Sequence, residues 1–166
     1  LFVFDTETDS LDPFKLNILG ASFSTKAGEG YFVAIDPGSK IFSDGKKRLP
    51  VDDFKKIFKP ILENKKIKKV CQNGKYDISV MRGLGIKVEN FHFDTMIASY
   101  LIDPDQKHGM DALSEKYLSY QPIPLSELIG EKKDPTKLYD VEVEKLSDYA
   151  AEDADITYQL YEILSK

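Results

Sequence analysis

The chain opens with four hydrophobic residues, LFVF, that no polar residue interrupts. A strand without alternation is typical of the centre of a sheet covered on both faces, so residues 1–5 are predicted to form such a strand. Two more strands are predicted at residues 17–25 and 31–36, separated by turn-forming residues at 26–30. We expect these three neighbouring strands to pair in antiparallel fashion.

Beyond residue 36 the pattern changes mainly to helical spacing. Residues 37–50 are predicted to be loop, residues 68–72 a short strand, and residues 119–137 a loop with at most short helices. Helices are predicted over residues 51–64, 73–85, 93–104 (capped by Asp94), 110–118 and 143–166. This order of strands and helices indicates a mixed α/β sheet with helices on its faces.

Two acids, Asp5 and Glu7, follow the hydrophobic start of the chain with one residue between them. In an extended chain, residues two apart point to the same side, so the two carboxylates are expected to converge at the rim of the core. Like charges there repel each other and burial penalises each of them, so a cation is expected between them. The alternative is a solvent-exposed turn that starts at Asp5.

The predicted C-terminal helix carries one acid on its apolar side. Steps of three and four residues define the stripe: Leu146, Tyr149, Ala150, Asp153, Ile156, Thr157, Leu160, Ile163 and Leu164. Asp153 lies in the middle of this stripe and needs a partner, because an unpaired buried carboxylate is costly. Other acids of the helix lie off the stripe and are expected to face solvent: Asp148, Glu152, Asp155 and Glu162.

Tyr149 precedes Asp153 by one helical turn on the same face, so its hydroxyl and the Asp153 carboxylate can address a common point. Two alternatives stay open at this stage. Tyr149 can be a core aromatic with a hydrated hydroxyl, and Asp153 can pair with a lysine.

A further acid, Asp77, lies at the start of a predicted helix, where acids often serve only as caps or dipole partners. Together with Asp5, Glu7 and Asp153 it makes four carboxylates from three separate elements, and the chain offers no obvious buried cation to match them. Sites built only from oxygen ligands suit Mg²⁺ or Mn²⁺, and two such ions serve phosphoryl transfer. The acids therefore indicate a site for two divalent metal ions.

Composition narrows the class of protein. With 166 residues, 42% hydrophobic and 31% charged, the chain fits one globular domain rather than a disordered segment. No apolar run approaches the ~20 residues that a membrane span needs, and no signal peptide is visible. The chain begins inside a predicted strand, so its natural N-terminus is expected to be missing. One cysteine and two histidines make an internal disulfide or structural zinc site unexpected, which fits a reducing cytoplasmic setting.

The net charge of −5 argues against nucleic acid as a partner, because proteins that bind phosphates are usually basic. That objection weakens if several of the acids bind divalent cations, because the ions reverse the local field.

Three segments of the chain carry a family resemblance: DTETDSLD, QNGKYD and YAAEDAD. They resemble the three exonuclease motifs of the DEDD superfamily, whose fold is ribonuclease H-like. The third segment matches the subclass whose third motif is Tyr-x-x-x-Asp. More narrowly, the chain resembles the 3′–5′ proofreading domain of bacterial DNA polymerase I in three segments: FDTMIASYLIDP, HGMDALSEKYL and YAAEDADITYQL. The likeness covers essentially the whole chain, in the family's motif order. It implies a ribonuclease H-like mixed sheet, with three antiparallel strands and then parallel strands, and a single exonuclease domain over residues 1–166 of a longer polymerase chain.

The resemblance also implies roles for the acids. Asp5, Glu7 and Asp153 would hold one divalent ion, Mg²⁺ or Mn²⁺. Asp5 would also reach a second ion, held mainly through water near Asp77. Tyr149 would orient the attacking water. Two cations supply an activated water, charge stabilisation and a neutralised leaving oxygen, so no side-chain nucleophile is required.

The resemblance also implies a set of residues that contact the substrate: Thr6, Leu11, Gln72, Asn73, Lys75, Tyr76, Lys107, His108 and Leu125. Among them, Leu11 would wedge against the last bases. Lys107 stands where the family often has arginine, and Leu125 where a known relative has an aromatic residue. These departures bear on the strength of substrate binding. His108 is not needed as a general base and is interpreted as structural or as a substrate contact.

The leading hypothesis is a metal-dependent 3′–5′ exonuclease that acts on single-stranded or frayed DNA ends and proofreads for a DNA polymerase. A polymerase domain is expected to follow in the full-length chain, and the domain is expected to be a monomer. One alternative is a ribonuclease of the same superfamily. The other is a non-catalytic domain that buttresses a polymerase, which is disfavoured because all four acids and Tyr149 are present.

Overall fold

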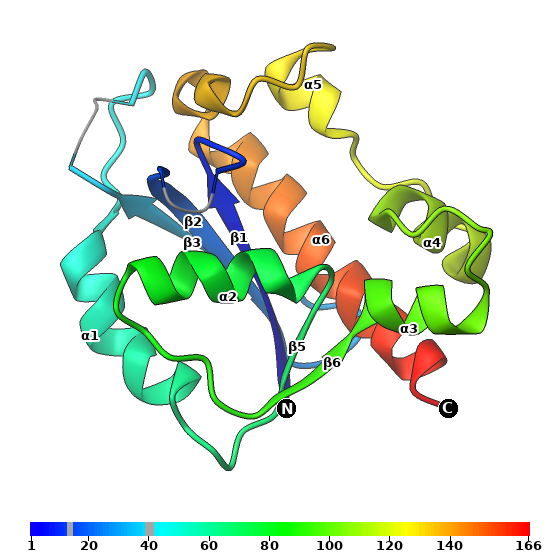
Figure 1. Ribbon diagram of the computed structural model, residues 1–166. Coiled ribbons are helices and arrows are strands. Elements are labelled where there is room, and N and C mark those ends of the chain that lie inside the picture. Colours follow the sequence, from blue (N-terminus) through cyan, green and yellow to red (C-terminus); the bar gives the residue numbers. More distant parts are fainter. Residues whose placement is uncertain (13–14, 39–41) are drawn as a thin grey trace.

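The computed structural model describes residues 1–12, 15–38 and 42–166, and within these ranges it contains one six-stranded sheet (Figure 1). The strands are β1 (Phe2–Thr8), β2 (Ile18–Ser24), β3 (Tyr31–Asp36), β4 (Leu49–Pro50), β5 (Lys69–Cys71) and β6 (Phe91–Asp94). Their spatial order is β4-β3-β2-β1-β5-β6, so the hydrophobic first strand lies inside the sheet.

The pairing pattern of the sheet confirms the predicted mixed α/β fold. β1 and β2 pair antiparallel, as do β2 and β3, whereas β5 pairs parallel with both β1 and β6. The short β4 pairs parallel with β3. Val3 and Phe4 in β1 are fully buried, as expected for a strand covered on both faces.

The helices begin and end close to the predicted positions. They are α1 (Val51–Leu62), α2 (Gly74–Gly83), α3 (Thr95–Ile102), α4 (Met110–Leu118), α5 (Leu125–Ile129), the 3₁₀ helix η1 (Pro135–Asp140) and α6 (Val143–Leu164). The predicted cap of α3 is confirmed, because the Asp94 carboxylate accepts hydrogen bonds from the backbone N–H groups of Met96 and Ile97. Helix α3 nevertheless starts later than expected, since Phe91–Asp94 form strand β6.

Strand β4 was also not predicted. It occupies two residues at the end of segment 37–50, which was expected to be loop and of which residues 39–41 lie outside the described residues. Segment 119–137 contains the five-residue helix α5 and the start of η1, in agreement with the expectation of short helices.

The two faces of β1 belong to different cores. Phe2 and Phe4 pack in one cluster with residues of α1 and α2, including Phe54 and Met81, whereas Val3 packs with Ala154 of α6. Because side chains alternate along a strand, Asp5 and Glu7 face α6 together with Val3, and Thr6 faces α1 and α2. Figure 1 shows α6 on one side of the sheet and α1 and α2 on the other.

Helix α6 lies very close to the sheet at the start of β3. A Cβ atom on Gly30 would lie 2.0 Å from the carbonyl oxygen of Ala151, so only glycine fits at this position. The backbone N–H of nearby Gly28 donates to Asp155 Oδ1 at 2.7 Å. These contacts hold the middle of α6, which carries Asp153, against the sheet.

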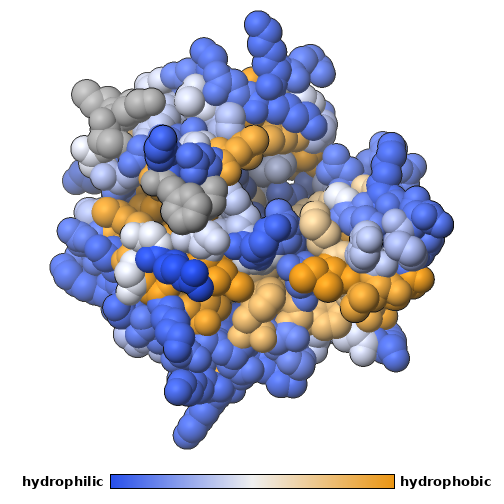
Figure 2. Space-filling view, viewed as in Figure 1, coloured by the Kyte–Doolittle hydropathy of each residue, from blue (hydrophilic) through white to orange (hydrophobic). Residues whose placement is uncertain are grey.

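Helix α3 exposes apolar side chains at the surface. Ile97, Leu101 and Ile102 are 55%, 78% and 58% exposed, and Figure 2 shows the orange patch that covers this helix. The neighbouring core is built by α4 and α6, through Leu113 and Leu160. No helix within the described ranges has a stretch long and apolar enough to cross a bilayer.

Candidate active site

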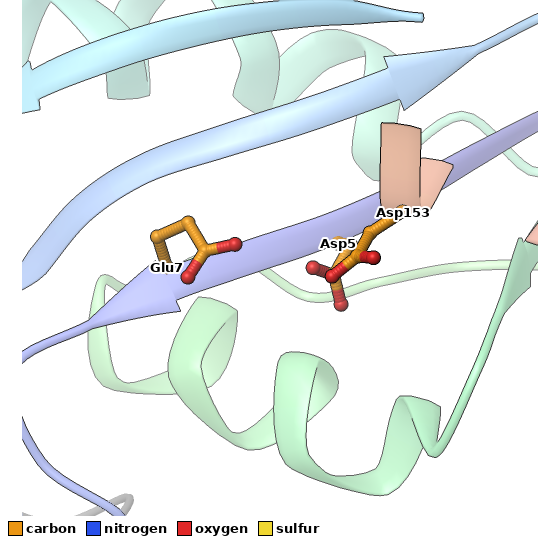
Figure 3. A group of neighbouring side chains, drawn as sticks. All are labelled: Asp5, Glu7 and Asp153. Carbon is orange, nitrogen blue, oxygen red and sulfur yellow. The ribbon is translucent and has the colours of Figure 1, made fainter. Parts of the chain in front are cut away.

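Three carboxylates meet between β1 and α6. One oxygen each of Asp5, Glu7 and Asp153 lies within 4.8 Å of the other two. Figure 3 shows the Asp5 and Asp153 carboxylates together and that of Glu7 directed toward them from further along β1. The predicted convergence is confirmed, and the alternative of a solvent-exposed turn starting at Asp5 is wrong because this residue lies in the middle of a strand.

Burial and mutual repulsion disfavour the charged form of these acids. Burial raises the pKa of Asp5 to about 7. Burial also raises the pKa of Glu7 well above its ordinary value, and the charges of Asp5, Asp153 and Asp77 raise it further. For Asp153 the pKa is raised by burial and then by the charge of Asp5. A positive charge placed among the three carboxyl groups would oppose these shifts, because it favours the charged form.

Among the described residues, no basic side chain forms an ion pair with these three acids, so the alternative of a lysine partner for Asp153 is wrong. Two basic side chains are buried among the described residues, but both bind elsewhere, which agrees with the expectation that no obvious buried cation matches the four acids. Lys69 donates to the Asn64 carbonyl oxygen at 2.6 Å, and Arg48 pairs with Asp44.

Tyr149 contacts both the hydrophobic core and the acids. Its ring packs against a cluster that includes Leu19 and Leu146, and it is half-buried. Its hydroxyl is exposed to the charge of Asp153, and burial together with this charge raises the pKa of the phenol. A core position and a position in the site are therefore compatible for this residue.

Asp77 lies beside the three-acid group but is not part of it. Its buried carboxylate accepts a hydrogen bond from the Thr6 hydroxyl at 2.6 Å, on the face of β1 that carries α2. Burial raises its pKa, followed by the charge of Asp5. The backbone N–H groups of Asn73 and Gly74 at the start of α2 are bound by Asp94 instead, at 3.1 and 2.9 Å.

Residues expected around the nucleotide path differ in exposure. Leu11 is 80% exposed, in the segment that follows β1, and Asn73 and Lys75 are exposed at the start of α2. Tyr76 is half-buried, and its hydroxyl donates to the Ser10 carbonyl oxygen at 2.6 Å and is hydrogen-bonded with Thr8. Tyr76 thus connects α2 to the segment that carries Leu11.

Gln72 and His108 are joined to each other and to the protein framework. The Gln72 amide donates to the His108 carbonyl oxygen at 2.8 Å and accepts from the Thr95 hydroxyl. The His108 ring nitrogens lie 2.9 Å from Ser99 Oγ and 3.4 Å from the Pro104 carbonyl oxygen. These contacts fix the connection between α3 and α4.

The last two predicted contacts lie on different parts of the fold. Lys107 is exposed in the connection between α3 and α4. Leu125 is half-buried at the start of α5 and packs against the same hydrophobic cluster as Tyr149.

Comparison with known proteins decides the family. A family model described as 3′–5′ exonuclease matches residues 1–166. The chain belongs to the 3′–5′ exonuclease family. DNA polymerase I of Borreliella burgdorferi is 37% identical over 162 residues, and that of Pseudomonas aeruginosa is 35% identical over 167 residues. These matches cover 98% and 99% of this chain but only 17% and 18% of the relatives, so the chain spans less than a fifth of their length.

Solved structures with lower identity share the fold. Brucella melitensis NrnC bound to pGG has a TM-score of 0.71 at 22% identity, covering 99% of this chain and 71% of that one. Escherichia coli RNase D has a TM-score of 0.66 at 19% identity, covering 99% and 38%. The ribonuclease H-like fold and the resemblance to the DNA polymerase I exonuclease are therefore confirmed, and the chain is a 3′–5′ exonuclease domain.

Glu152, next to Asp153, has contacts that the sequence pattern did not predict. Its carboxylate accepts from the Tyr120 hydroxyl at 2.6 Å and from the Ile123 backbone N–H at 2.7 Å. The expectation that Glu152 and Asp155 face solvent holds only in part, since both are half-buried and bound to loops distant in sequence. No periodic signal identifies such partners, because they lie about 30 residues or more away in the chain.

Proposed function

We propose that this exonuclease domain hydrolyses the terminal phosphodiester at the 3′ end of single-stranded or frayed DNA, with two divalent ions, Mg²⁺ or Mn²⁺, and proofreads for a DNA polymerase. The observation that carries the proposal is the group of Asp5, Glu7 and Asp153, three converging carboxylates without a cation from the described chain. A frayed end is the proposed substrate because only an unpaired terminus can enter a site recessed between a strand and a helix.

The residues present fit divalent metal ions. The donor set consists of carboxylate oxygens, which Mg²⁺ and Mn²⁺ prefer. In addition, the buried Ser22 hydroxyl, opposite Asp5 on β2, has no hydrogen-bond partner. Asp5, Glu7 and Asp153 would hold one ion, and Asp5 with nearby Asp77 would serve a second. Such ions supply an activated water and charge stabilisation for phosphodiester hydrolysis.

The chain's own side chains have proposed roles in positioning. Tyr149, whose hydroxyl is influenced by the charge of Asp153, would orient the attacking water. Thr6 would hold the Asp77 carboxylate through its 2.6 Å hydrogen bond. His108 would act as a structural residue rather than a general base, since Ser99 and Pro104 engage its ring nitrogens.

Substrate contacts are proposed for the residues that the family resemblance implies. Leu11, Asn73 and Lys75 are exposed and free to meet a nucleotide. Lys107, also exposed, would contribute one positive charge toward the phosphates. For buried Gln72 and for Tyr76 we propose an indirect role, in which they hold the surrounding segments.

The cellular setting is part of the proposal. The relatives that match are DNA polymerase I proteins several times longer than this chain, which supports a single exonuclease domain over residues 1–166 that works beside a polymerase domain following it. We propose a cytoplasmic, monomeric domain. Mg²⁺ as the physiological ion gains support from the Brucella nuclease of the same fold, which has been solved with bound Mg²⁺.

Digestion of end-labelled oligonucleotides tests the function. The substrates are single-stranded DNA, duplex DNA with a 3′ mismatch, fully paired duplex and RNA, each with Mg²⁺, Mn²⁺ or EDTA. We expect stepwise shortening of single-stranded and mismatched DNA from the 3′ end, only with metal. Faster digestion of RNA than of DNA would favour a ribonuclease, and no digestion of any substrate with either metal would favour the buttressing role.

A further inference from the structure

The buried hydroxyl of Ser22, next to the three-acid group, has no hydrogen-bond partner among the described residues. Within the described ranges, the fully buried side-chain atoms without a hydrogen-bond partner are Ser22 Oγ, Arg48 Nε and Thr157 Oγ1. Ser22 is only 1% exposed. Buried hydroxyl groups are normally hydrogen-bonded, so an unpartnered one needs an explanation, such as a role beside a bound ion.

The strand register places Ser22 opposite a candidate metal ligand. Ser22 on β2 pairs with Asp5 on β1 in the antiparallel ladder. Directly opposite residues lie on the same face with Cβ atoms about 4.5–5.5 Å apart, so rotation about χ1 of Ser22 can direct its hydroxyl at the Asp5 carboxylate. No backbone movement is required.

A second buried serine on β2 provides a contrast. Ser24 follows two residues later on the same face and pairs with Val3, an apolar residue. It is fully buried, and its hydroxyl donates to the Lys26 carbonyl oxygen at 3.1 Å. Ser24 therefore has a structural partner and no acid opposite, whereas Ser22 has an acid opposite and no partner.

We propose that Ser22 is a positioning residue for the metal site, whose hydroxyl donates a hydrogen bond to the Asp5 carboxylate when that carboxylate holds a divalent ion. This inference rests on the proposed function. A donor behind a ligating carboxylate fixes its orientation and leaves the outward oxygen lone pairs to the metal, and removing such an outer partner typically weakens metal binding about 10–100-fold.

Calorimetric titration with Mn²⁺ and thermal melting in EDTA test the role. In Ser22→Ala we expect Mn²⁺ affinity to fall at least about tenfold while the metal-free melting temperature stays equal or rises, because an unpartnered buried hydroxyl is removed. Ser22→Thr retains a hydroxyl and is expected to bind Mn²⁺ within about threefold of the wild type. The matched control Ser24→Ala should melt earlier in EDTA and keep its Mn²⁺ affinity.

Wild-type affinity in Ser22→Ala would overturn the inference, as would weakened binding accompanied by a lower metal-free melting temperature. Equally weak binding by Ser22→Ala and a Ser22→Thr variant of wild-type stability would also overturn it. If the wild type itself binds no Mn²⁺ or Mg²⁺, the proposed function fails. If the wild type binds metal and Ser22→Ala binds it equally well, only the inference about Ser22 fails.

Discussion

Two carboxylate sites beside helix α6 differ in how their charge is compensated. The Asp44 carboxylate accepts two hydrogen bonds of 2.9 Å from the Arg48 guanidinium and one of 3.0 Å from the backbone N–H of Val143, the first residue of α6. These bonds, led by those from Arg48, hold the pKa of Asp44 well below its ordinary value. At Asp5, in contrast, burial raises the pKa to about 7, and no basic side chain in the described part of the chain is paired with the carboxylate.

The contrast separates a carboxylate with a basic partner from a group of carboxylates that, among the described residues, has none. Arg48 lies four residues after Asp44, packs over the Phe42 ring at 3.6 Å, and completes its site within one loop. Asp5, Glu7 and Asp153 come from two elements far apart in sequence, and the described chain brings no cation to them. Removing Arg48 would leave the Asp44 charge uncompensated in the fold, whereas under the proposed function a divalent ion from solution would compensate the charges of Asp5, Glu7 and Asp153.

The largest effect is expected from removing charge at Asp153. Asp153→Asn keeps the shape of the side chain but removes one of three ligand charges, so hydrolysis of single-stranded DNA should fall by roughly three orders of magnitude or more while far-UV circular dichroism stays native. The matched control is Asp148→Asn, an exposed acid on the same helix, which should retain its rate. Near wild-type turnover in Asp153→Asn would show that this residue holds no metal.

The arginine site should respond in stability instead. Arg48→Met leaves the Asp44 carboxylate buried without its cation, and breaking such a pair costs about 3–5 kcal/mol, measured by urea unfolding. The control is Lys55→Met, whose pair with Asp52 is exposed and should contribute no more than about 1 kcal/mol. Equal losses of unfolding free energy in the two variants would contradict the distinction.

A smaller effect on rate is expected at Tyr149. Tyr149→Phe removes a hydroxyl that is influenced by the charge of Asp153 but leaves all carboxylates, so hydrolysis should slow about 10–100-fold and Mn²⁺ affinity should stay unchanged. Tyr158→Phe, another half-buried tyrosine of α6, serves as control and should retain its rate. Complete loss of Mn²⁺ binding in Tyr149→Phe, seen by calorimetry, would assign the hydroxyl to metal ligation instead.

The two sites should also give opposite dependences of stability on pH. Asp5 has a folded pKa of about 7 and an ordinary value of 3.8, so between these pH values the folded state binds more protons than the unfolded state. Metal-free stability should therefore decline as pH rises from about 4 to about 7. The Asp44 pair contributes in the opposite sense, because its folded pKa is lowered and its stabilisation is lost as pH falls below about 4.

Melting curves in EDTA across this range measure both trends. The decline between pH 4 and 7 should be shallower in an Asp5→Ala/Glu7→Ala variant, and saturating Mn²⁺ should remove it from the wild type, because the ion displaces the protons. A wild type whose metal-free melting temperature is as flat with pH as that of the double variant would contradict the raised pKa values.

Local periodicity was sufficient to predict the central parts of the site. The uninterrupted hydrophobic start identified β1, the two-residue spacing brought Asp5 and Glu7 to one face, and the helical stripe turned Asp153 inward. These inferences succeed because each depends on the geometry of one element. The helix boundaries at α4 and α6 follow from the same kind of signal.

The remaining features depend on tertiary pairing that no local pattern contains. Strands β4 and β6 are two and four residues long and form only because β3 and β5 present edges to them. The Asp44 bond to Val143 joins residues 99 positions apart, and Glu152 binds loops that the stripe cannot identify. The position of Asp77, on the Thr6 side of β1, required knowledge of which face α2 covers.

Thermal melting tests whether the carboxylates of Asp5, Glu7 and Asp153 form a cation site. The wild type and the Asp5→Ala/Glu7→Ala variant are melted in EDTA and across a Mn²⁺ titration. In the wild type, Mn²⁺ at a hundredfold excess over its dissociation constant should stabilise the fold by about 2.7 kcal/mol. The double variant should melt at the same or a higher temperature in EDTA, because the repulsion is gone, and should show no metal-dependent increase. An equal Mn²⁺-induced increase in both proteins would contradict the site.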